Sequence, residues 1–186
     1  MKKIVIACWY RNASILPYTL KALTKHVPQY RTEVVMAGEN EPWCTSIRRF
    51  CRVTSEPFLL MLEDYITVDA DAQLLEMAWD RAKDYGCVRL LPCPGSEDTA
   101  AEFGPIHPEE RYSVSLQASI WQPDALLSVT EDGKTAWDAE IGGMRRYAAN
   151  PTYRTVCTNR NAISYDNAMR GLKILPDVLA KAEAML

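Results

Sequence analysis

Two adjacent carboxylates, Glu63 and Asp64, directly follow the most hydrophobic run of the chain, Phe58–Leu62. Carboxylates at the end of a buried strand cost free energy unless they meet a cation, a hydrogen-bond donor or water. Mg²⁺ and Mn²⁺ prefer oxygen ligands, commonly one or two carboxylates together with substrate phosphates. We therefore predict that Glu63 and Asp64 bind a divalent cation that a diphosphate ligand brings with it. In a second interpretation of the same residues, both acids cap the following turn or pair with an arginine.

A second group of acids stands beside an aromatic ring, with Trp137, Asp138 and Glu140 close together in the sequence. An aromatic face can cover the C–H surface of a sugar ring, and a carboxylate can take a proton from a sugar hydroxyl. This pattern favours Asp138 or Glu140 as a general base and Trp137 as a contact to a sugar acceptor. The alternative is a surface loop whose Trp137 is buried in the core.

The hydrophobic pattern of the first half predicts the elements that position these groups. Short apolar runs alternate with helical patterns about every 25–30 residues, which is typical of βαβ units and a parallel sheet. Strands are expected at 3–9, 33–37, 58–62 and 88–91, and helices at 16–27, 42–51 and 72–85.

Ligands of such sheets bind outside the carboxyl ends of the strands. The residues that follow each predicted strand are therefore candidates for a binding site. They are Arg11 and Asn12 after the first strand, Gly38 and Glu39 after the second, and Glu63 and Asp64 after the third.

The second half of the chain is less regular. The stretch 95–110 is rich in Gly, Pro and acids and is predicted as a loop of functional size. A strand-like pattern resumes at 112–121, and Gly142 and Gly143 precede a return to helix or loop. An amphipathic helix is predicted at 177–186, and no linker or internal repeat divides the chain.

Composition and charge exclude several classes of protein. The 186 residues are 48% hydrophobic and 24% charged, which is ordinary for a single globular domain. There is no run of about 20 apolar residues, no GxGxxG and no GxxxxGK[ST], so a membrane span and two common nucleotide-binding motifs are disfavoured. The apolar start is shorter than the core of a signal peptide, and we expect a cytoplasmic protein.

The net charge of −3 gives no general case for nucleic acid, but the charges are uneven. Within 141–175, six basic residues face the single acid Asp166, which predicts local attraction of an anionic ligand. The alternative is a set of scattered surface arginines. The basic residues are Arg145, Arg146, Arg154, Arg160, Arg170 and Lys173.

Four segments together carry a family resemblance. They are LLMLEDY at 59–65, VRLLPCPG at 88–95, YSVSLQASIW at 112–121, and Glu131 followed by Trp137, Asp138 and Glu140. In this order they resemble the acidic motif, the next strand with its loop, the YxxSLQxxIW segment and the E…WxxE segment of small bacterial and viral glycosyltransferases of the GT-A fold.

The resemblance implies a single GT-A-like domain over 1–186, with a nucleotide-sugar-binding half at 1–95 and a shortened acceptor half at 96–186. The implied fold is three-layered and Rossmann-like, with a mixed, mostly parallel sheet and helices on both faces. The implied reaction moves a sugar from a nucleoside-diphosphate donor to a hydroxyl of a glycan or other acceptor, with Mn²⁺ or Mg²⁺. A second subunit of a homo-oligomer could complete the short acceptor half.

The resemblance also assigns roles to residues. Glu140 is the preferred general base of an inverting enzyme, and in a retaining enzyme the same carboxylate would stabilise the developing cation. Trp137 and Gln117 are implied contacts of the acceptor. Arginines of the basic segment, Arg145, Arg146 or Arg154, are expected to neutralise the leaving diphosphate together with the cation. The implied donor-binding residues are Arg11, Asn12, Gly38, Glu39, Arg89, Arg145 and Arg146.

One departure from the family pattern bears on the metal. The usual motif is Asp-x-Asp, whereas here Glu63 and Asp64 are followed by Tyr65, so one carboxylate is missing unless Asp69 or Asp71 supplies it. This departure keeps open a non-catalytic relative that binds a nucleotide or glycan. Two further classes also stay open, a nucleotidyltransferase and a nucleic-acid-modifying transferase, although the nucleotidyltransferase class usually has a Gly-rich basic loop after the first strand.

Overall fold

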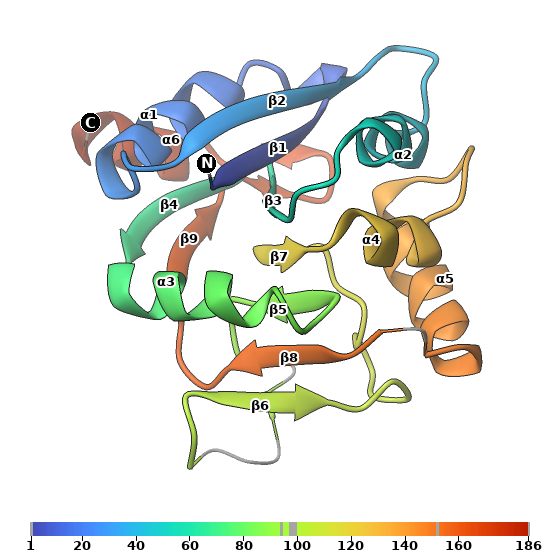
Figure 1. The fold of residues 1–186 in the computed structure, drawn as a ribbon. Helices are drawn as coiled ribbons and strands as arrows, with labels where there is room; N and C mark the ends of the chain where they lie inside the picture. Colours follow the sequence, from blue (N-terminus) through green and yellow to red (C-terminus); the bar gives the residue numbers. More distant parts are fainter. Residues whose placement is uncertain (1, 94, 97–99, 152, 186) are drawn as a thin grey trace.

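A seven-stranded sheet forms the centre of the protein in a computed structural model that describes residues 2–93, 95–96, 100–151 and 153–185 (Figure 1). Its strand order is β2-β1-β3-β7-β5-β8-β6. The strands are β1 (Lys3–Trp9), β2 (Arg31–Ala37), β3 (Phe58–Leu62), β5 (Cys87–Arg89), β6 (Phe103–Ile106), β7 (Ser119–Trp121) and β8 (Thr155–Thr158).

Two small antiparallel sheets and six α-helices complete the described fold. One small sheet pairs β4 (Tyr65–Ala70) with β9 (Ile163–Asn167), and the other pairs β10 (Met169–Arg170) with β11 (Lys173–Ile174). The helices are α1 (Leu16–His26), α2 (Trp43–Val53), α3 (Ala72–Arg81), α4 (Pro123–Val129), α5 (Ala136–Ala149) and α6 (Pro176–Met185). A 3₁₀ turn covers Tyr10–Asn12. Among the described helices, none has both the length and the apolar character needed to cross a bilayer.

The central sheet is mixed and mostly parallel, as predicted. Strands β2, β1 and β3 are parallel neighbours, and β5 and β8 are parallel to each other. Strand β7 lies antiparallel between β3 and β5, so β5 and β8 run in the same direction as β1. Only β7 and the edge strand β6 are reversed among the seven.

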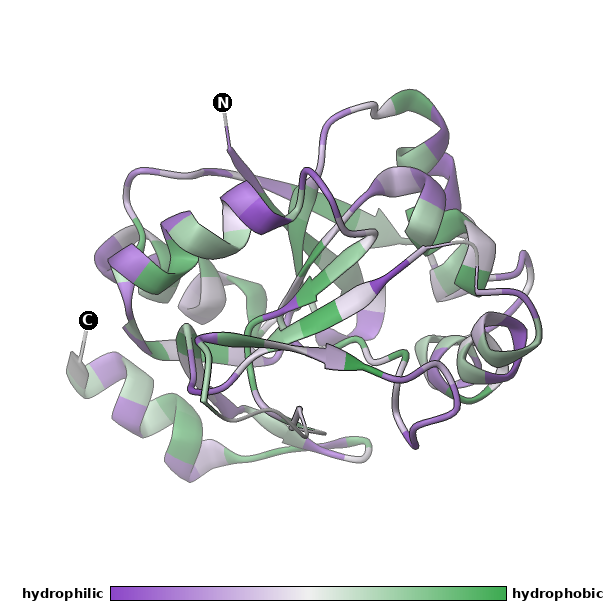
Figure 2. Ribbon diagram, turned by 60° about the horizontal axis from the view of Figure 1, so that its bottom comes forward, coloured by the Kyte–Doolittle hydropathy of each residue, from purple (hydrophilic) through white to green (hydrophobic). Residues whose placement is uncertain are grey.

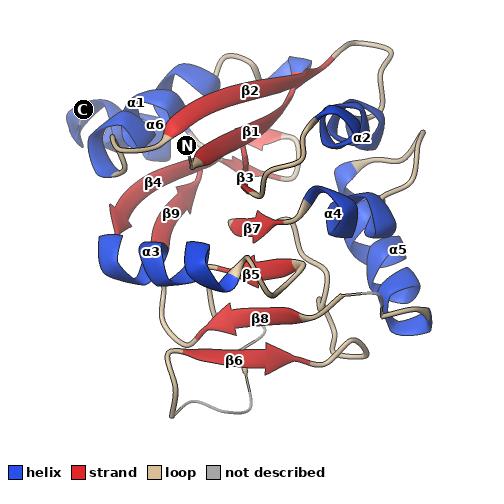
Figure 3. Cartoon of the chain, in the orientation of Figure 1, coloured by secondary structure: helices blue, strands red, loops and turns tan. Residues whose placement is uncertain are grey.

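Helices cover both faces of this sheet, which explains why β1 and β3 are apolar without alternation (Figure 3). Successive side chains of a strand point to opposite faces, so Ile4 and Ile6 pack with α1 and α3, while Val5 and Ala7 pack with α2, α4 and α5. Ile4, Val5 and Ile6 are fully buried. Figure 2 shows the same arrangement as hydrophobic colouring concentrated on the inner strands.

Several predicted elements are confirmed and others are wrong. Strands β1 and β3 have the predicted bounds, and the helix predicted at 72–85 is α3, which ends earlier, at Arg81. Strand β4, which the sequence did not predict, begins at Tyr65 directly after Asp64 and pairs with β9. That partner is about a hundred residues away in the sequence, at 163–167, so no local pattern could reveal the pairing.

The second half contains the other wrong predictions. The stretch 95–110, predicted as a loop, contains β6, which is held by its antiparallel pairing to β8. Only Ser119–Trp121 of the strand-like run 112–121 is a strand. Gly142 and Gly143 do not interrupt a helix but lie inside α5, where Gly143 is buried against α4.

These two glycines allow a matched test of the α4–α5 contact. A Cβ at Gly143 would lie 2.8 Å from the backbone oxygen of Val129, whereas a Cβ at Gly142 would meet only the flexible end of Arg146 at 3.3 Å. We expect Gly143→Ala to destabilise the protein by about 1–3 kcal/mol through overpacking. Gly142→Ala should be neutral or stabilising by up to about 1 kcal/mol, because alanine favours a helix. Urea denaturation of both variants measures the difference, and equal effects would contradict this packing.

Candidate functional site

A cleft of about 730 Å³ opens where β1 and β3 end. Trp9 ends β1 and Leu62 ends β3, and both line the cleft. This is the carboxyl edge of the parallel strands, at which ligands of open α/β sheets bind. Of the predicted site residues, the cleft brings together Asn12, Glu39, Glu63, Asp64 and Trp137.

Glu63 is the buried member of the acid pair, with 4% of its surface exposed. Its Oε1 accepts hydrogen bonds from the side-chain amide of Asn12 at 2.6 Å and from the backbone N–H of Trp9 at 3.4 Å. The hydroxyl of Thr19 donates to its backbone oxygen. Burial raises the pKa of Glu63, and these donors oppose that rise. Glu63 therefore joins β1, the 3₁₀ turn, α1 and β3 at the floor of the cleft.

Asp64 is the half-buried member and has a different environment. It stands between β3 and β4, and its backbone oxygen accepts a hydrogen bond from the N–H of Ala168 at 2.7 Å. Burial, together with the negative charge of Glu63, raises the pKa of Asp64 to about 6. Ten ion pairs form among the described residues, and none of them includes Asp64. No described lysine or arginine therefore neutralises this carboxylate by direct pairing. Asp64 is therefore an uncompensated carboxylate at the cleft.

Asp69 and Asp71, the two residues that could have supplied the missing carboxylate, do not line the cleft. Asp71 caps α3 by accepting the N–H of Leu74 at 2.9 Å and also pairs with Arg160. Asp69 lies five residues along β4 from Asp64, which is about 16 Å in an extended strand. Across the residues that the structure describes, no group of three His, Cys, Asp or Glu side chains could hold a metal ion. The oxygen donors of this cleft thus fit a cation that shares its ligands with a phosphate group rather than a cage made by the protein.

Trp137 lies at the rim of the cleft and is 65% exposed, so the alternative that it is buried in the core is wrong. The next residue, Asp138, has a structural role at the start of α5. Its Oδ2 accepts the N–H of Thr135 at 3.0 Å, and its own N–H donates to the Thr135 hydroxyl at 3.1 Å, which is a capping box at the start of α5. These hydrogen bonds lower the pKa of Asp138. The structure does not place Asp138 among the residues that line the cleft.

Glu140 is half-buried behind the cleft rather than in its lining. Its Oε1 accepts the hydroxyl of Ser115 at 3.0 Å and the N–H of Leu116 at 2.7 Å. The other carboxylate oxygen, Oε2, has no hydrogen-bond partner among the described residues. Glu140 therefore anchors the segment before β7 with one oxygen and keeps the second free.

Arg89 is not at the cleft, contrary to its predicted contact with a donor. It is 1% exposed and donates to the backbone oxygen of Tyr112 at 2.9 Å and to Oε1 of Gln117 at 3.1 Å. Burial lowers the pKa of Arg89. Gln117, a predicted acceptor contact, is thus held by Arg89. The apolar neighbours of Arg89, which are Val88 and Leu90, were a signal in the sequence that this strand is buried on both faces.

Contrary to the prediction, Arg145 and Arg146 of the basic segment 141–175 do not line the cleft. Arg146 donates to Glu131 at 3.0 Å and to the backbone oxygen of Val129 at 2.6 Å, and Arg145 is exposed along α5. Arg11 lies over the ring of Trp9 at 5.0 Å, near the rim, and Gly38 directly precedes Glu39. Of the implied cationic donor contacts, only Arg11 is therefore beside the cleft.

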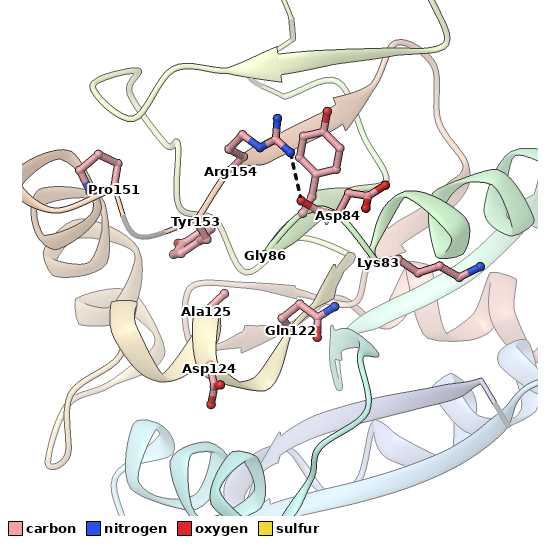
Figure 4. A pocket seen from close by; sticks show the side chains of 10 residues that line it. Lys83, Asp84, Gly86, Gln122, Asp124, Ala125, Pro151, Tyr153 and Arg154 are labelled. Carbon is pink, nitrogen blue, oxygen red and sulfur yellow. Dashed lines mark hydrogen bonds between the residues drawn. The ribbon is translucent and has the colours of Figure 1, made fainter.

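Arg154 lies at the opposite edge of the sheet, in a second cavity of about 540 Å³ at the amino ends of β5 and β8 (Figure 4). Its guanidinium lies 4.8 Å from the centre of the Tyr85 ring and donates to the backbone oxygen of Asp84 at 3.5 Å. Because ligands of such sheets bind at the carboxyl ends of the strands, the cleft at Asp64 is the stronger candidate for the functional site.

Sequence reasoning missed part of the cleft wall. Trp9 and Trp43 line it, although their apolar surroundings suggested only a strand and a buried helix face. Met169, Gly171 and Leu172 line it from the β10–β11 hairpin. The only signal for this hairpin was a glycine between basic and apolar residues at 169–174.

Comparisons with known proteins locate the fold. No family model matches the chain, and no curated protein matches it. A protein of Bacillus anthracis assigned as a glucose-1-phosphate thymidylyltransferase, in complex with a sucrose, has a TM-score of 0.53 at 11% identity, covering 100% of this chain and 94% of that one. At this identity the likeness shows a shared fold, and it agrees with the predicted Rossmann-like α/β class.

Two further solved structures have lower TM-scores. UDP-glucose pyrophosphorylase complexed with UDP-glucose has a TM-score of 0.47 at 12% identity, covering 99% of this chain and 80% of that one. HddC from Yersinia pseudotuberculosis complexed with GMP-PN has a TM-score of 0.48 at 12% identity, covering 98% and 78%.

The raised pKa of Asp64 predicts a pH-dependent stability. Because the pKa is higher in the folded state, ionisation of Asp64 opposes folding, and its stabilising contribution is lost as the pH rises from about 4 to about 6. Asp64→Asn removes this cost. We expect the variant to exceed the wild type by about 3 kcal/mol in unfolding free energy near pH 7, with a difference that shrinks toward pH 4.

Urea denaturation across this pH range measures the effect. Asp71→Asn is the control of opposite sign, because the hydrogen bond from Leu74 lowers the pKa of Asp71. That variant should be less stable than the wild type at neutral pH. A stability difference for Asp64→Asn that does not change with pH would contradict the burial of this carboxylate.

Proposed function

We propose that this protein is a divalent-metal-dependent glycosyltransferase, which moves a sugar from a nucleoside-diphosphate donor to a hydroxyl acceptor at the cleft beside Asp64. The observation that carries the proposal is the uncompensated Asp64 carboxylate, half-buried at the carboxyl edge of the sheet. The fold shared with the Bacillus anthracis protein and the four motif resemblances support it.

The charge of the cleft determines how a donor can bind. Four carboxylates line it, those of Glu39, Glu41, Glu63 and Asp64, and no described lining residue is a lysine or arginine. A diphosphate would be repelled by this set unless a cation lay between them. Asp64 is the proposed protein ligand, with Glu63 behind it, and Mg²⁺ or Mn²⁺ bound there would neutralise charge on the departing diphosphate. Asn12 positions the pair through its hydrogen bond to Glu63.

The apolar walls of the cleft suit a flat ring. Trp9 and Trp43 line it from one side, and the exposed ring of Trp137 lies at the rim. Aromatic faces cover the C–H surfaces of sugars or stack on a base. We propose Trp137 as a contact of the acceptor, because it is accessible from solvent.

Glu140 is the proposed general base, through Oε2. Its Oε1 is already occupied by Ser115 and Leu116, which fix the orientation of the carboxylate. A base must reach the proton that it removes, and this geometry often tightens only when substrate binds. Asp138 is less suited, because its carboxylate is occupied in the capping box.

A nucleotidyltransferase that acts on a sugar phosphate is the second candidate, favoured by the fold likeness to the Bacillus anthracis protein. Against it, the chain has no glycine before Gly38. The turn after β1 is a closed 3₁₀ turn whose Asn12 is bonded to Glu63, rather than a glycine-rich loop that could surround a triphosphate. Release of pyrophosphate from a nucleoside triphosphate and a sugar phosphate would identify this activity.

Donor binding should require both a cation and Asp64. In a thermal-shift screen of nucleoside-diphosphate sugars with Mn²⁺, a donor at a hundred times its dissociation constant should stabilise the wild type by about 2.7 kcal/mol. The shift should vanish with chelator and in Asp64→Asn, although that variant is more stable without ligand. Asp80→Asn, which changes an exposed acid of α3, should keep the shift. A donor that binds Asp64→Asn as tightly as the wild type would remove the basis of this proposal.

Glu140→Gln should separate catalysis from folding. The amide oxygen of glutamine can still accept the hydrogen bonds from Ser115 and Leu116, so the melting temperature should change little. Loss of a general base should lower the rate of sugar transfer by about 10²–10⁴-fold. Rates measured at saturating donor test this, and a near wild-type rate would assign the proton transfer to another group.

A further inference from the structure

The β10–β11 hairpin presents its tip to solvent beside the cleft. Gly171 has a φ of +62°, which allows the tight reversal between Arg170 and Lys173. Leu172, the other residue of the turn, is 84% exposed, the largest exposure among the described large hydrophobic residues. At this exposure the apolar side chain of Leu172 remains in water, and it gains free energy only when another surface covers it.

The charges of the hairpin are also unusual. Arg170 and Lys173 are directly opposite each other in the two-stranded ladder, where like charges oppose pairing. Both are exposed, and neither forms an ion pair within the described part of the chain. Two other basic residues of this region differ, since Arg146 pairs with Glu131 and Arg160 pairs with Asp71. The hairpin thus holds two cations without an internal counter-charge around an exposed leucine.

Apolar groups of the rim extend this surface. Leu172 and Met169 line the same cleft as Trp137, whose ring is 65% exposed. Exposed apolar side chains from the hairpin and from α5 therefore line one cleft, and Arg170 and Lys173 flank the turn that carries Leu172.

The hairpin is tied to the acid pair. Ala168, fully buried before β10, donates its N–H to the backbone oxygen of Asp64 at 2.7 Å and accepts the N–H of Leu175 at 2.8 Å. Both ends of the hairpin are thus held on one residue that is bonded to Asp64. Whatever binds the tip is held at a defined position relative to the cleft.

We infer that the tip of this hairpin, together with Trp137, docks the protein on an anionic lipid surface. An exposed leucine and an indole ring insert at the level of the headgroups, and flanking cations are attracted to anionic lipids. The chain carries a net charge of −3 and carboxylates line the cleft itself, so the attraction to such a surface comes from Arg170 and Lys173 at the hairpin. One consequence of this inference rests on the proposed function: a membrane at this position would present the acceptor to the cleft.

Vesicle co-sedimentation tests the inference with the whole chain. The protein should sediment with vesicles of phosphatidylcholine and phosphatidylglycerol at low ionic strength, less at higher salt, and not with phosphatidylcholine alone. The double variant Arg170→Gln, Lys173→Gln should bind about 30-fold more weakly, from about fivefold for each charge. Leu172→Ser should weaken binding about tenfold.

Val53→Ser is the matched control, because Val53 is 83% exposed at the far end of α2 from the cleft. It should bind vesicles like the wild type. Melting temperatures of all variants should be unchanged, since the altered side chains are exposed. A wild type that ignores anionic vesicles would overturn the inference, as would equal losses for Leu172→Ser and Val53→Ser. So would a concentration-dependent dimer that Leu172→Ser dissociates without any vesicle binding, because the surface would then contact a second copy of the chain.

Vesicle binding needs neither donor nor turnover, so its result is independent of the transferase assays. Loss of lipid binding with intact sugar transfer in solution would reject only the docking surface. Lipid binding by a protein that binds no donor would reject only the proposed reaction.

Discussion

The buried carboxylate of Glu63 is the constraint on which the site depends. A carboxylate that is 4% exposed is tolerable only with donors, and these come from Trp9 at the end of β1 and Asn12 in the following turn. Its backbone oxygen takes the hydroxyl of Thr19 from α1. One residue thus sets the relative positions of a strand end, a turn and a helix. The neighbouring Asp64 is left facing the cleft without a donor of this kind.

The first half of the fold and the acid pair could be predicted from the sequence, because they depend on local patterns. The runs of β1 and β3 are apolar on both faces, and the acids follow the more hydrophobic of them. Pairings between distant segments have no such local signal. Strand β4 exists because of β9, and β6 exists because of β8, so both were missed. The hairpin wall of the cleft was missed for the same reason.

The number of basic residues could be read from the sequence, but the residues that they pair with in the fold could not. The excess of basic residues in 141–175 suggested one anion site. In the structure Arg146 and Arg160 are compensated by acids from distant segments, and Arg154 is at the opposite edge of the sheet. Arg89 shows the same limit in a different way, since a cation in a fully buried strand holds Tyr112 and Gln117 rather than a ligand. The residue type indicated that these arginines could bind an anion. Whether their guanidinium groups are free to do so depends on the residues that they contact in the fold.

Strand β7 is synthesised after β3 and β5, between which it lies in the sheet, and this order affects how the nascent chain folds. Strands β1, β2 and β3 can pair as soon as they leave the ribosome, but β3 and β5 are joined only through β7, at residues 119–121. Until then the facing edges of β3 and β5 are unpaired, and such edges are prone to wrong association. The vulnerable interval of the nascent chain begins at about residue 90 and ends only with β8, at Thr155–Thr158, because β8 pairs with the other edge of β5. The slowest folding step is expected to be the pairing of β5 with β8, because Cys87 and Thr155 are farther apart in the sequence than any other paired residues of the central sheet.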